Sequence, residues 1–163
     1  ALSMVSDKLL RRLEPDVISY NAAISACEKG AHWREAINLI SGMRLRRLAP
    51  DVVTINAAIS ACDQAAQWQE AMRLVAGMQL HDLCTDDLTY NAAINACQTG
   101  AQWQYAVGLL ADMRLRRFEP TVVTCNEAIS ACEKSGHSHQ AFGVIGYTMT
   151  AVHNRGCFNG KDE

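Results

Sequence analysis

The sequence predicts an all-α fold, an α-solenoid (a right-handed superhelix) of stacked antiparallel helix-turn-helix repeats, and two observations support it. The first is a repeat of 35 residues that runs without a gap through blocks 17–51, 52–86, 87–121 and 122–156. The second is the spacing of apolar residues in each block, which follows helical turns and nowhere alternates as in a strand. A fixed period of this length is typical of one supersecondary unit stacked on itself.

Each block is predicted to hold two helices. In block 17–51, the residues that share one face of the first helix are Tyr20, Ala23, Ile24 and Cys27. The residues that share one face of the second helix are Trp33, Ala36, Ile37 and Ile40. Gly30 indicates the turn between them, because glycine is the usual residue just past a helix end. The prolines that stop the second helices are Pro15, Pro50 and Pro120.

The two ends of the chain depart from the repeat. Residues 1–16 are predicted to be the end of a preceding block, because LLRRLEPD matches the LRRLAPD that closes block 17–51. Block 122–156 diverges after Ala141, as terminal repeats do, and residues 157–163 are expected to be a flexible polar tail. We therefore expect a piece or a processed product of a longer protein. The sequence contains neither a secretory signal nor an apolar run that could span a membrane.

The composition argues against several function classes. The 15 Lys and Arg against 17 Asp and Glu give a net charge of -2, which disfavours nucleic-acid binding through phosphates alone. No catalytic constellation or phosphate-binding loop recurs, so we expect no enzyme, no small-molecule substrate and no cofactor. A terminal group of possible metal ligands has a spacing that fits no zinc site: His137, His139, His153 and Cys157.

Three further sets of residues recur in the blocks. Cysteines at block position 11 are interpreted as small buried thiols rather than disulfides: Cys27, Cys62, Cys97 and Cys132. Tryptophans at one site of the second helix are interpreted as core anchors: Trp33, Trp68 and Trp103. Basic runs close the second helix at Arg11-Arg12, 44–47 and 114–117. These runs favour a solvated outer face, although an acidic partner or RNA could also use them.

The junction between blocks resembles a known family. Residues 49–59, APDVVTINAAI, are similar to the pentatricopeptide repeat consensus of Pro-Asp, a hydrophobic pair, Thr-Tyr-Asn and a helix. A tetratricopeptide unit has 34 residues with Gly and Tyr at set positions of its first helix, and these blocks lack that pattern. The resemblance implies an organellar protein, of the chloroplast or mitochondrion, that binds single-stranded RNA with one base per repeat.

The resemblance also implies which residues contact RNA. Block position 5, together with the last residue of the same block, would choose the base, and the aliphatic residue at position 2 would wedge between bases. The implied base-reading pairs are Asn21 with Asp51, Asn56 with Asp86, Asn91 with Thr121, and Asn126 with Gly156, while Asp16 would complete the block before. The first two pairs imply uracil, the third a pyrimidine, and the fourth lacks a second polar side chain. The implied wedges are Ile18, Val53, Leu88 and Val123.

The chemistry of these residues leaves alternatives open. An Asn amide both donates and accepts, so it can read the edge of an unstacked base, and a carboxylate only accepts, which suits the N3–H of uracil. Lys29 and Lys134, at block position 13, could help bind phosphate. The recurrent Asn could instead cap its helix or make local side-chain bonds. A second function is a scaffold subunit that binds protein inside an organellar ribosome or a photosynthetic or respiratory complex.

Overall fold

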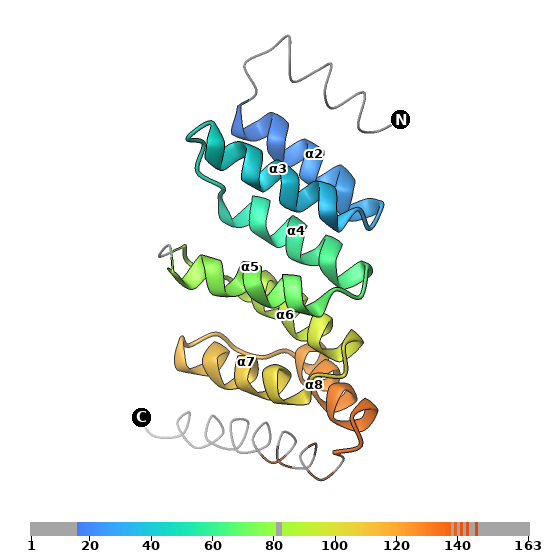
Figure 1. The fold of residues 1–163 in the computed structure, drawn as a ribbon. Helices are drawn as coiled ribbons and strands as arrows, with labels where there is room; N and C mark the ends of the chain where they lie inside the picture. The colour runs from blue at the N-terminus through green and yellow to red at the C-terminus, as the bar shows by residue number, and fades with distance from the viewer. Residues whose placement is uncertain are drawn as a thin grey trace, which may run out of the picture.

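The computed structural model describes residues 16–80 and 83–137, together with residues 139, 141, 143 and 146. This described part contains seven α-helices of 13 residues each and no strand, stacked as helical hairpins (Figure 1). They are α2 (Val17–Lys29), α3 (Trp33–Leu45), α4 (Val52–Gln64), α5 (Trp68–Leu80), α6 (Asp87–Thr99), α7 (Trp103–Leu115) and α8 (Val122–Lys134). The predicted all-α repeat solenoid is confirmed. The predicted repeat remnant before Asp16, the tail 157–163, Gly156, His153 and Cys157 lie outside the described residues.

Each first helix is capped at its N-terminus by the last residue of the block before it. Asp16, Asp51, Asp86 and Thr121 have extended backbone, and each side chain accepts a hydrogen bond from the N–H three residues later. At Asp51, Asp86 and Thr121 the bond is reciprocal, because the threonine three residues later accepts from the cap's own N–H. Such capping boxes satisfy backbone donors that the helix itself leaves free.

The helix α2 ends just before Gly30, where the sequence predicts the turn, but Gly30 is not the left-handed residue of that turn. Gly30 has a φ of -100°, and the left-handed residue is the next one, Ala31, with a φ of 53°. The N–H of Ala31 donates to the Glu28 carbonyl and that of His32 to the Cys27 carbonyl, which is the Schellman pattern. The residues at this left-handed position are Ala31, Ala66, Ala101 and Gly136.

The glycine at the end of α6 serves close packing instead. A Cβ atom on Gly100 would lie 2.4 Å from Cδ1 of Trp68 on the preceding repeat. Gly100 therefore lets the indole of Trp68 approach the turn, and its own φ is right-handed.

Replacing Ala66 with glycine is expected to stabilise the fold by about 0.5–1 kcal/mol, because alanine is disfavoured in the left-handed region and glycine is not. Urea unfolding followed by circular dichroism measures the change. The reverse substitution, Gly136→Ala, has the opposite expected sign at the equivalent turn, where φ is 76°. A loss of stability in Ala66→Gly would contradict this account.

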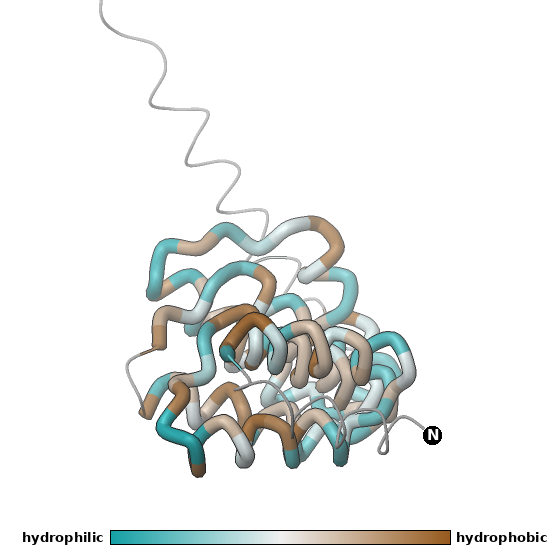
Figure 2. The backbone as a smooth tube through the Cα atoms, turned by 90° about the horizontal axis from the view of Figure 1, so that it is seen from above, coloured by the Kyte–Doolittle hydropathy of each residue, from teal (hydrophilic) through white to brown (hydrophobic). Residues whose placement is uncertain are grey.

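The helices form two layers (Figures 1 and 2). The first helices, α2, α4, α6 and α8, pack successively against one another, and α3, α5 and α7 each lie between their own first helix and the next one. Along the tube in Figure 2 apolar and polar segments alternate, as amphipathic helices require. Small residues fill the closest approaches, and several have no exposed surface: Ala36, Ala58, Ala71, Ala93, Ala106 and Ala128.

The recurrent cysteines belong to this core. Cys27, Cys62, Cys97 and Cys132 are buried and free, which confirms the prediction of unpaired thiols. Burial raises the pKa of Cys97 to about 12. The pKa of Cys62 is raised to the same value, by burial first and then by the negative charge of Glu70. These thiols are therefore protonated at neutral pH and act as small apolar side chains.

The tryptophans lie at the edge of the core rather than inside it, so their interpretation as core anchors is only partly right. Trp33, Trp68 and Trp103 are half-buried. Each is the first residue of its second helix, and the indoles of Trp68 and Trp103 lie beside the turn of the following repeat. The ring of Trp103 stacks on His137, with centroids 4.9 Å apart.

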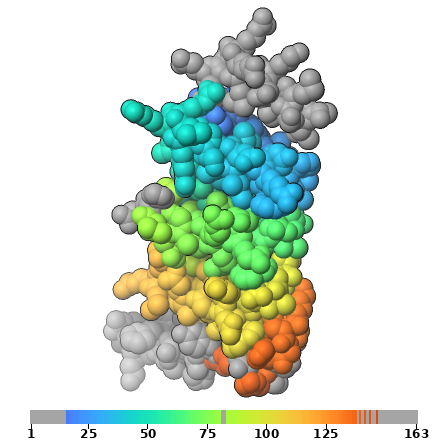
Figure 3. Space-filling view, viewed as in Figure 1, coloured from blue at the N-terminus to red at the C-terminus, as the bar shows by residue number. Residues whose placement is uncertain are grey.

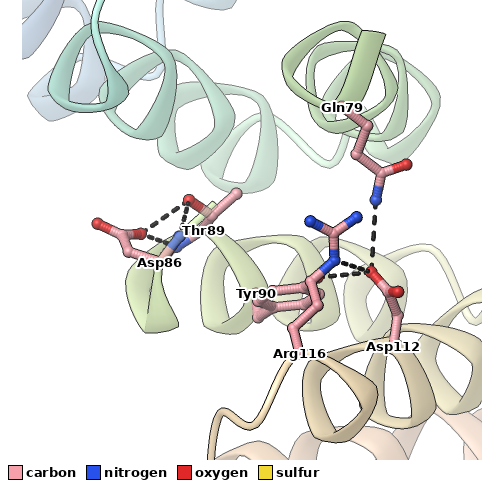
Figure 4. A network of polar contacts seen from close by, with 6 residues as sticks. All are labelled: Gln79, Asp86, Thr89, Tyr90, Asp112 and Arg116. Atoms are coloured by element: carbon pink, nitrogen blue, oxygen red, sulfur yellow. Dashed lines mark hydrogen bonds and ion pairs between the residues drawn. The ribbon is translucent and has the colours of Figure 1, made fainter. Parts of the chain in front are cut away.

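A polar network joins the second and third repeats at Tyr90 (Figure 4). The buried Tyr90 hydroxyl donates to Oδ2 of Asp112 over 2.5 Å. The same oxygen accepts from Nε of Arg116 at 3.2 Å and from Nε2 of Gln79, on the preceding second helix, at 3.4 Å. Burial raises the pKa of Tyr90, and the bond to Asp112 raises it further.

Candidate nucleic-acid interface

One side of the first-helix layer is left open, and we call it the inner face. It consists of block positions 2, 5, 6, 9, 12 and 13, which are exposed or half-buried in α4 and α6, while positions 3, 4, 7, 8, 10 and 11 are buried. The open positions follow the helical spacing of one face. On α6 they are occupied by Leu88, Asn91, Ala92, Asn95, Gln98 and Thr99.

The predicted wedges form an exposed aliphatic row on the inner face. Ile18, Val53, Leu88 and Val123 keep between 64% and 76% of their surface accessible. Each lies in the first turn of its first helix, next to the helix cap. Apolar side chains that recur at one open position are available for contact with a planar apolar surface, such as a base.

The structure brings the first predicted base-reading pair together. Nδ2 of Asn21 lies 3.3 and 3.2 Å from Oδ1 and Oδ2 of Asp51. The Thr54 hydroxyl lies within hydrogen-bond distance of both Oδ1 of Asn21 and Oδ1 of Asp51. A hydroxyl has one proton, so it can donate to only one of these two acceptors at a time.

The second pair has the same geometry. Nδ2 of Asn56 donates to Oδ1 of Asp86 over 3.0 Å. The Thr89 hydroxyl lies 2.7 Å from Oδ1 of Asn56. It also lies 2.8 Å from Oδ1 of Asp86 (Figure 4). Each asparagine is therefore hydrogen-bonded to the aspartate through its amide nitrogen and to the threonine through its amide oxygen. One of its two amide hydrogens is used by neither bond.

The third pair is different. The Thr124 hydroxyl donates to Oδ1 of Asn91 over 2.7 Å, but the Thr121 hydroxyl bonds Thr124 at 2.8 Å instead of Asn91. No hydrogen bond joins Asn91 to Thr121 within the described residues, so the amide of Asn91 is held from one side only. Asn126 is exposed on α8, and its partner Gly156 lies outside the described residues.

The sequence analysis missed the threonines at block position 3. Thr54, Thr89 and Thr124 are buried and connect a helix cap to the asparagine of the repeat before it. Their signal was a hydroxyl residue at this position in every block, Ser19 included. Because the capping role belongs to the last residue of each block, the interpretation of the asparagines as helix caps is wrong. Their side chains are bonding partners of the caps.

The caps carry negative charge at neutral pH. Burial raises the pKa of Asp51, but hydrogen bonds from Thr54 and Asn21 outweigh it, and the net pKa is below the ordinary value. The pKa of Asp86 is lowered in the same way by Thr89 and Asn56. Both side chains are therefore carboxylates that can only accept hydrogen bonds.

The part of the inner face at the C-terminal ends of the first helices carries both positive and negative side chains. Lys29 and Lys134 are exposed there, and Nζ of Lys134 lies 3.4 Å from the Gln98 carbonyl. Asp63 accepts bonds from Asn95 and Thr99 of the next repeat, and its pKa is raised by burial. Lysines that could bind phosphate are therefore present in the first and fourth repeats. On the same face the second repeat carries the carboxyl group of Asp63.

Glu127 stands at block position 6, where the other blocks have alanine. Its Oε2 atom is buried and lacks a hydrogen-bond partner. Burial raises the pKa of Glu127, and the negative charge of Asp63 raises it further. This carboxyl disfavours both folding and an anionic ligand in its charged form.

Replacing Glu127 with alanine is expected to stabilise the fold by about 1 kcal/mol, because it removes the unpaired oxygen. It is also expected to strengthen RNA binding severalfold. In the natural chain the raised pKa values mean that lowering the pH protonates Glu127 and Asp63 before the other carboxyls, so RNA binding should strengthen as the pH falls from neutral into the mildly acidic range. Fluorescence anisotropy over this range measures the effect, with Glu127→Gln as the matched uncharged control. An identical pH response in wild type and Glu127→Ala would contradict it.

Within the described residues, no three His, Cys, Asp or Glu side chains are grouped so as to hold a metal ion. A search of the same residues finds no helix with the length and apolar character to cross a bilayer.

Comparison with known proteins identifies the repeat. The model of the PPR repeat family matches residues 15–64, and that of the pentatricopeptide repeat domain matches residues 73–135, which together is more than half of the chain. No protein of curated function matches the sequence significantly.

Solved structures share the fold. The pentatricopeptide repeat protein PPR10 from maize is 21% identical and matches 88% of this chain with a TM-score of 0.77. PPR10 in complex with an 18-nt psaJ RNA element is 25% identical over 83% of this chain, with a TM-score of 0.70. The chain spans 20% of the length of PPR10 in both cases. The PPR domain of Arabidopsis thaliana protein-only RNase P 1, in complex with tRNA, is 12% identical, with a TM-score of 0.73 over 93% of this chain and 86% of that domain.

Proposed function

Because the chain belongs to the pentatricopeptide repeat family, we propose that it binds single-stranded RNA along the inner face. The observation that carries the proposal is the pairing of Asn21 with Asp51 and of Asn56 with Asp86 beside an exposed aliphatic row. PPR10 and the PPR domain of the Arabidopsis RNase P protein are both solved with RNA, which supports binding by repeats of this fold. The proposed role is binding rather than catalysis.

The proposed readout is one base per repeat, with uracil at the first two. A carboxylate such as Asp51 accepts from the N3–H of uracil, and the unused amide hydrogen of Asn21 can donate to a uracil carbonyl. Adenine presents an acceptor at N1, which would face the carboxylate without a proton between them. For the third repeat we propose a looser pyrimidine preference, because Asn91 lacks a carboxylate partner.

The aliphatic row would separate the bases. Equivalent residues of adjacent repeats lie about 8–10 Å apart, as packed helices do, which exceeds the distance between stacked bases. The RNA must therefore be extended, and Val53 and Leu88 would fill the gaps next to the base of the second repeat. This arrangement fits single-stranded RNA and excludes a continuous stacked duplex.

The expected affinity is modest. Stacking contributes about 1–3 kcal/mol per base, so three or four bases give roughly 3–12 kcal/mol, and association costs at least about 4 kcal/mol of that. The remainder corresponds to about micromolar binding or weaker. We propose that this segment acts on organellar transcripts together with further repeats or a companion protein.

Binding of the purified chain to oligo-U and oligo-A over a salt series tests the proposal. We expect oligo-U to bind more tightly at every salt concentration, and the preference to persist when salt weakens both complexes. Equal and weak binding to the two oligomers would contradict base readout. That result would favour the scaffold function, in which the same surface binds protein.

A further inference from the structure

A second repeated surface lies at the ends of the second helices. Leu45, Leu80 and Leu115 are the last residues of α3, α5 and α7, and they keep 87%, 82% and 82% of their surface accessible. We call them the leucine row. One exposed leucine is ordinary, but the same exposure at one site of three stacked repeats makes an apolar line. None of the three belongs to the inner face, because they lie on the second helices.

Arginines flank the leucine row. Arg46 and Arg47 follow Leu45, and Arg116 and Arg117 follow Leu115. Arg116 pairs with Asp112 at 3.2 Å. Within the described residues, Arg46, Arg47 and Arg117 have no ion-pair partner, and all three are exposed. Their charge is therefore available to an external anionic group.

Two of these arginines occupy positions where glycine would be more stable. Arg47 and Arg117 have φ angles of 59° and 66°, in the left-handed region at the end of the helix. Each closes a Schellman-type turn in which the next residue, Leu48 or Phe118, donates back to a methionine carbonyl. Both arginines are exposed at these helix ends, where their charge can reach a partner.

The spacing of the leucine row matches one kind of partner. Adjacent repeats are about 8–10 Å apart, and seven residues of an α-helix rise about 10.5 Å. An apolar residue at every seventh position of a helix would therefore meet Leu45, Leu80 and Leu115 in succession. In Figure 3 the cyan and light-orange segments, which carry the ends of α3 and α7, project outward on the same side of the stack.

We propose that the leucine row and its arginines are a docking surface for an acidic amphipathic helix of a partner protein. The partner helix places apolar side chains on the three leucines and Glu or Asp side chains beside Arg46, Arg47 and Arg117. RNA phosphates could bind the arginines, but they would leave the apolar leucines without a binding partner. A bilayer favours a broad apolar face, whereas this surface is a line of single leucines.

A labelled synthetic helix tests the proposal by fluorescence anisotropy. The probe is a peptide with leucine at every seventh position, glutamate at the flanking positions and alanine elsewhere. The triple variant Leu45→Ser/Leu80→Ser/Leu115→Ser is expected to weaken its binding at least about tenfold, since the apolar contact is lost. Replacing the probe's leucines with serine should weaken binding to the wild-type chain equally.

The double variant Arg47→Gly/Arg117→Gly separates binding from folding. It is expected to unfold at a higher temperature than wild type, because glycine suits both turns, and still to bind the peptide severalfold more weakly. Its affinity for oligo-U is expected to be unchanged. Peptide binding that equals wild type in both multiple variants would overturn the proposal.

Two further outcomes would assign the surface to another ligand and would also overturn it. If Arg47→Gly/Arg117→Gly loses oligo-U rather than the peptide, the arginines contact RNA phosphates. If the wild-type chain binds vesicles of phosphatidylcholine and phosphatidylserine (4:1) but not the peptide, the surface contacts lipid.

Discussion

Replacing Asp86 with threonine is expected to remove the base preference of the second repeat without unfolding it. Threonine already occupies the equivalent site in the next repeat, where Thr121 caps α8 but makes no bond to Asn91. In the variant the introduced threonine would cap α6, while Asn56 would lose its carboxylate partner. We expect discrimination between uracil and adenine at this base to fall about tenfold, the value of one charge-assisted hydrogen bond. Stability should change by less than about 0.5 kcal/mol.

Two control variants make this prediction sharp. Asp86→Ala removes both the cap and the partner of Asn56, so it should lose the same discrimination and also about 1 kcal/mol of stability. Thr121→Asp should give Asn91 the partner it lacks and raise the preference of the third repeat for uracil. Anisotropy with oligomers that differ at one base, together with urea unfolding, measures both effects. Intact discrimination in Asp86→Thr would show that Asn56 reads the base without the carboxylate.

Tyr90→Ala is expected to cause the largest loss of stability among single substitutions, about 3–5 kcal/mol. The ring is 1% exposed and packs on Phe118 with centroids 5.8 Å apart. The hydroxyl also donates to Asp112, so removing the side chain leaves a cavity and takes away one of the three donors to Oδ2 of Asp112. Urea or thermal unfolding followed by circular dichroism measures the loss.

The second repeat supplies the matched control for Tyr90. There the equivalent positions hold Ile55 and Gly77, with no polar network between them. Tyr90→Ile should therefore cost less stability than Tyr90→Ala, because isoleucine leaves a smaller cavity at this position. Tyr90→Phe should cost only about 1 kcal/mol. A cost for Tyr90→Ala as small as that for Tyr90→Phe would refute the packing role.

The fold could be predicted because the same residue pattern recurs in each repeat. An apolar position such as Ile24 recurs as Ile59, Ile94 and Ile129, so the helical period is read four times. The pairing of Asn21 with Asp51 was implied by the resemblance to the pentatricopeptide repeat, and the base-reading role of the pair stays a prediction. Features of a single repeat, such as the bond between Tyr90 and Asp112, could not be predicted in this way because their residues do not recur.

Two details of the helix ends could not be predicted, for one physical reason. The sequence places the turn at Gly30, but it does not show that the left-handed residue of that turn is Ala31. The asparagine was considered as a helix cap, but the cap is the aspartate before the helix. In both cases neighbouring residues could perform the same backbone role, and only the geometry distinguishes them. The role of the Thr54 hydroxyl was missed because residue spacing does not show which hydrogen bonds a side chain makes.

The central claim is that the asparagines beside the capping aspartates read bases. Its most direct test compares wild type with Asn21→Thr/Asn56→Thr on two RNAs, a UU step and a GG step in the same adenine flanks. Wild type should prefer UU, and the double variant, with Asp51 and Asp86 unchanged, should shift its preference toward GG. If both proteins bind the two RNAs equally, the inner face does not read bases and the claim fails.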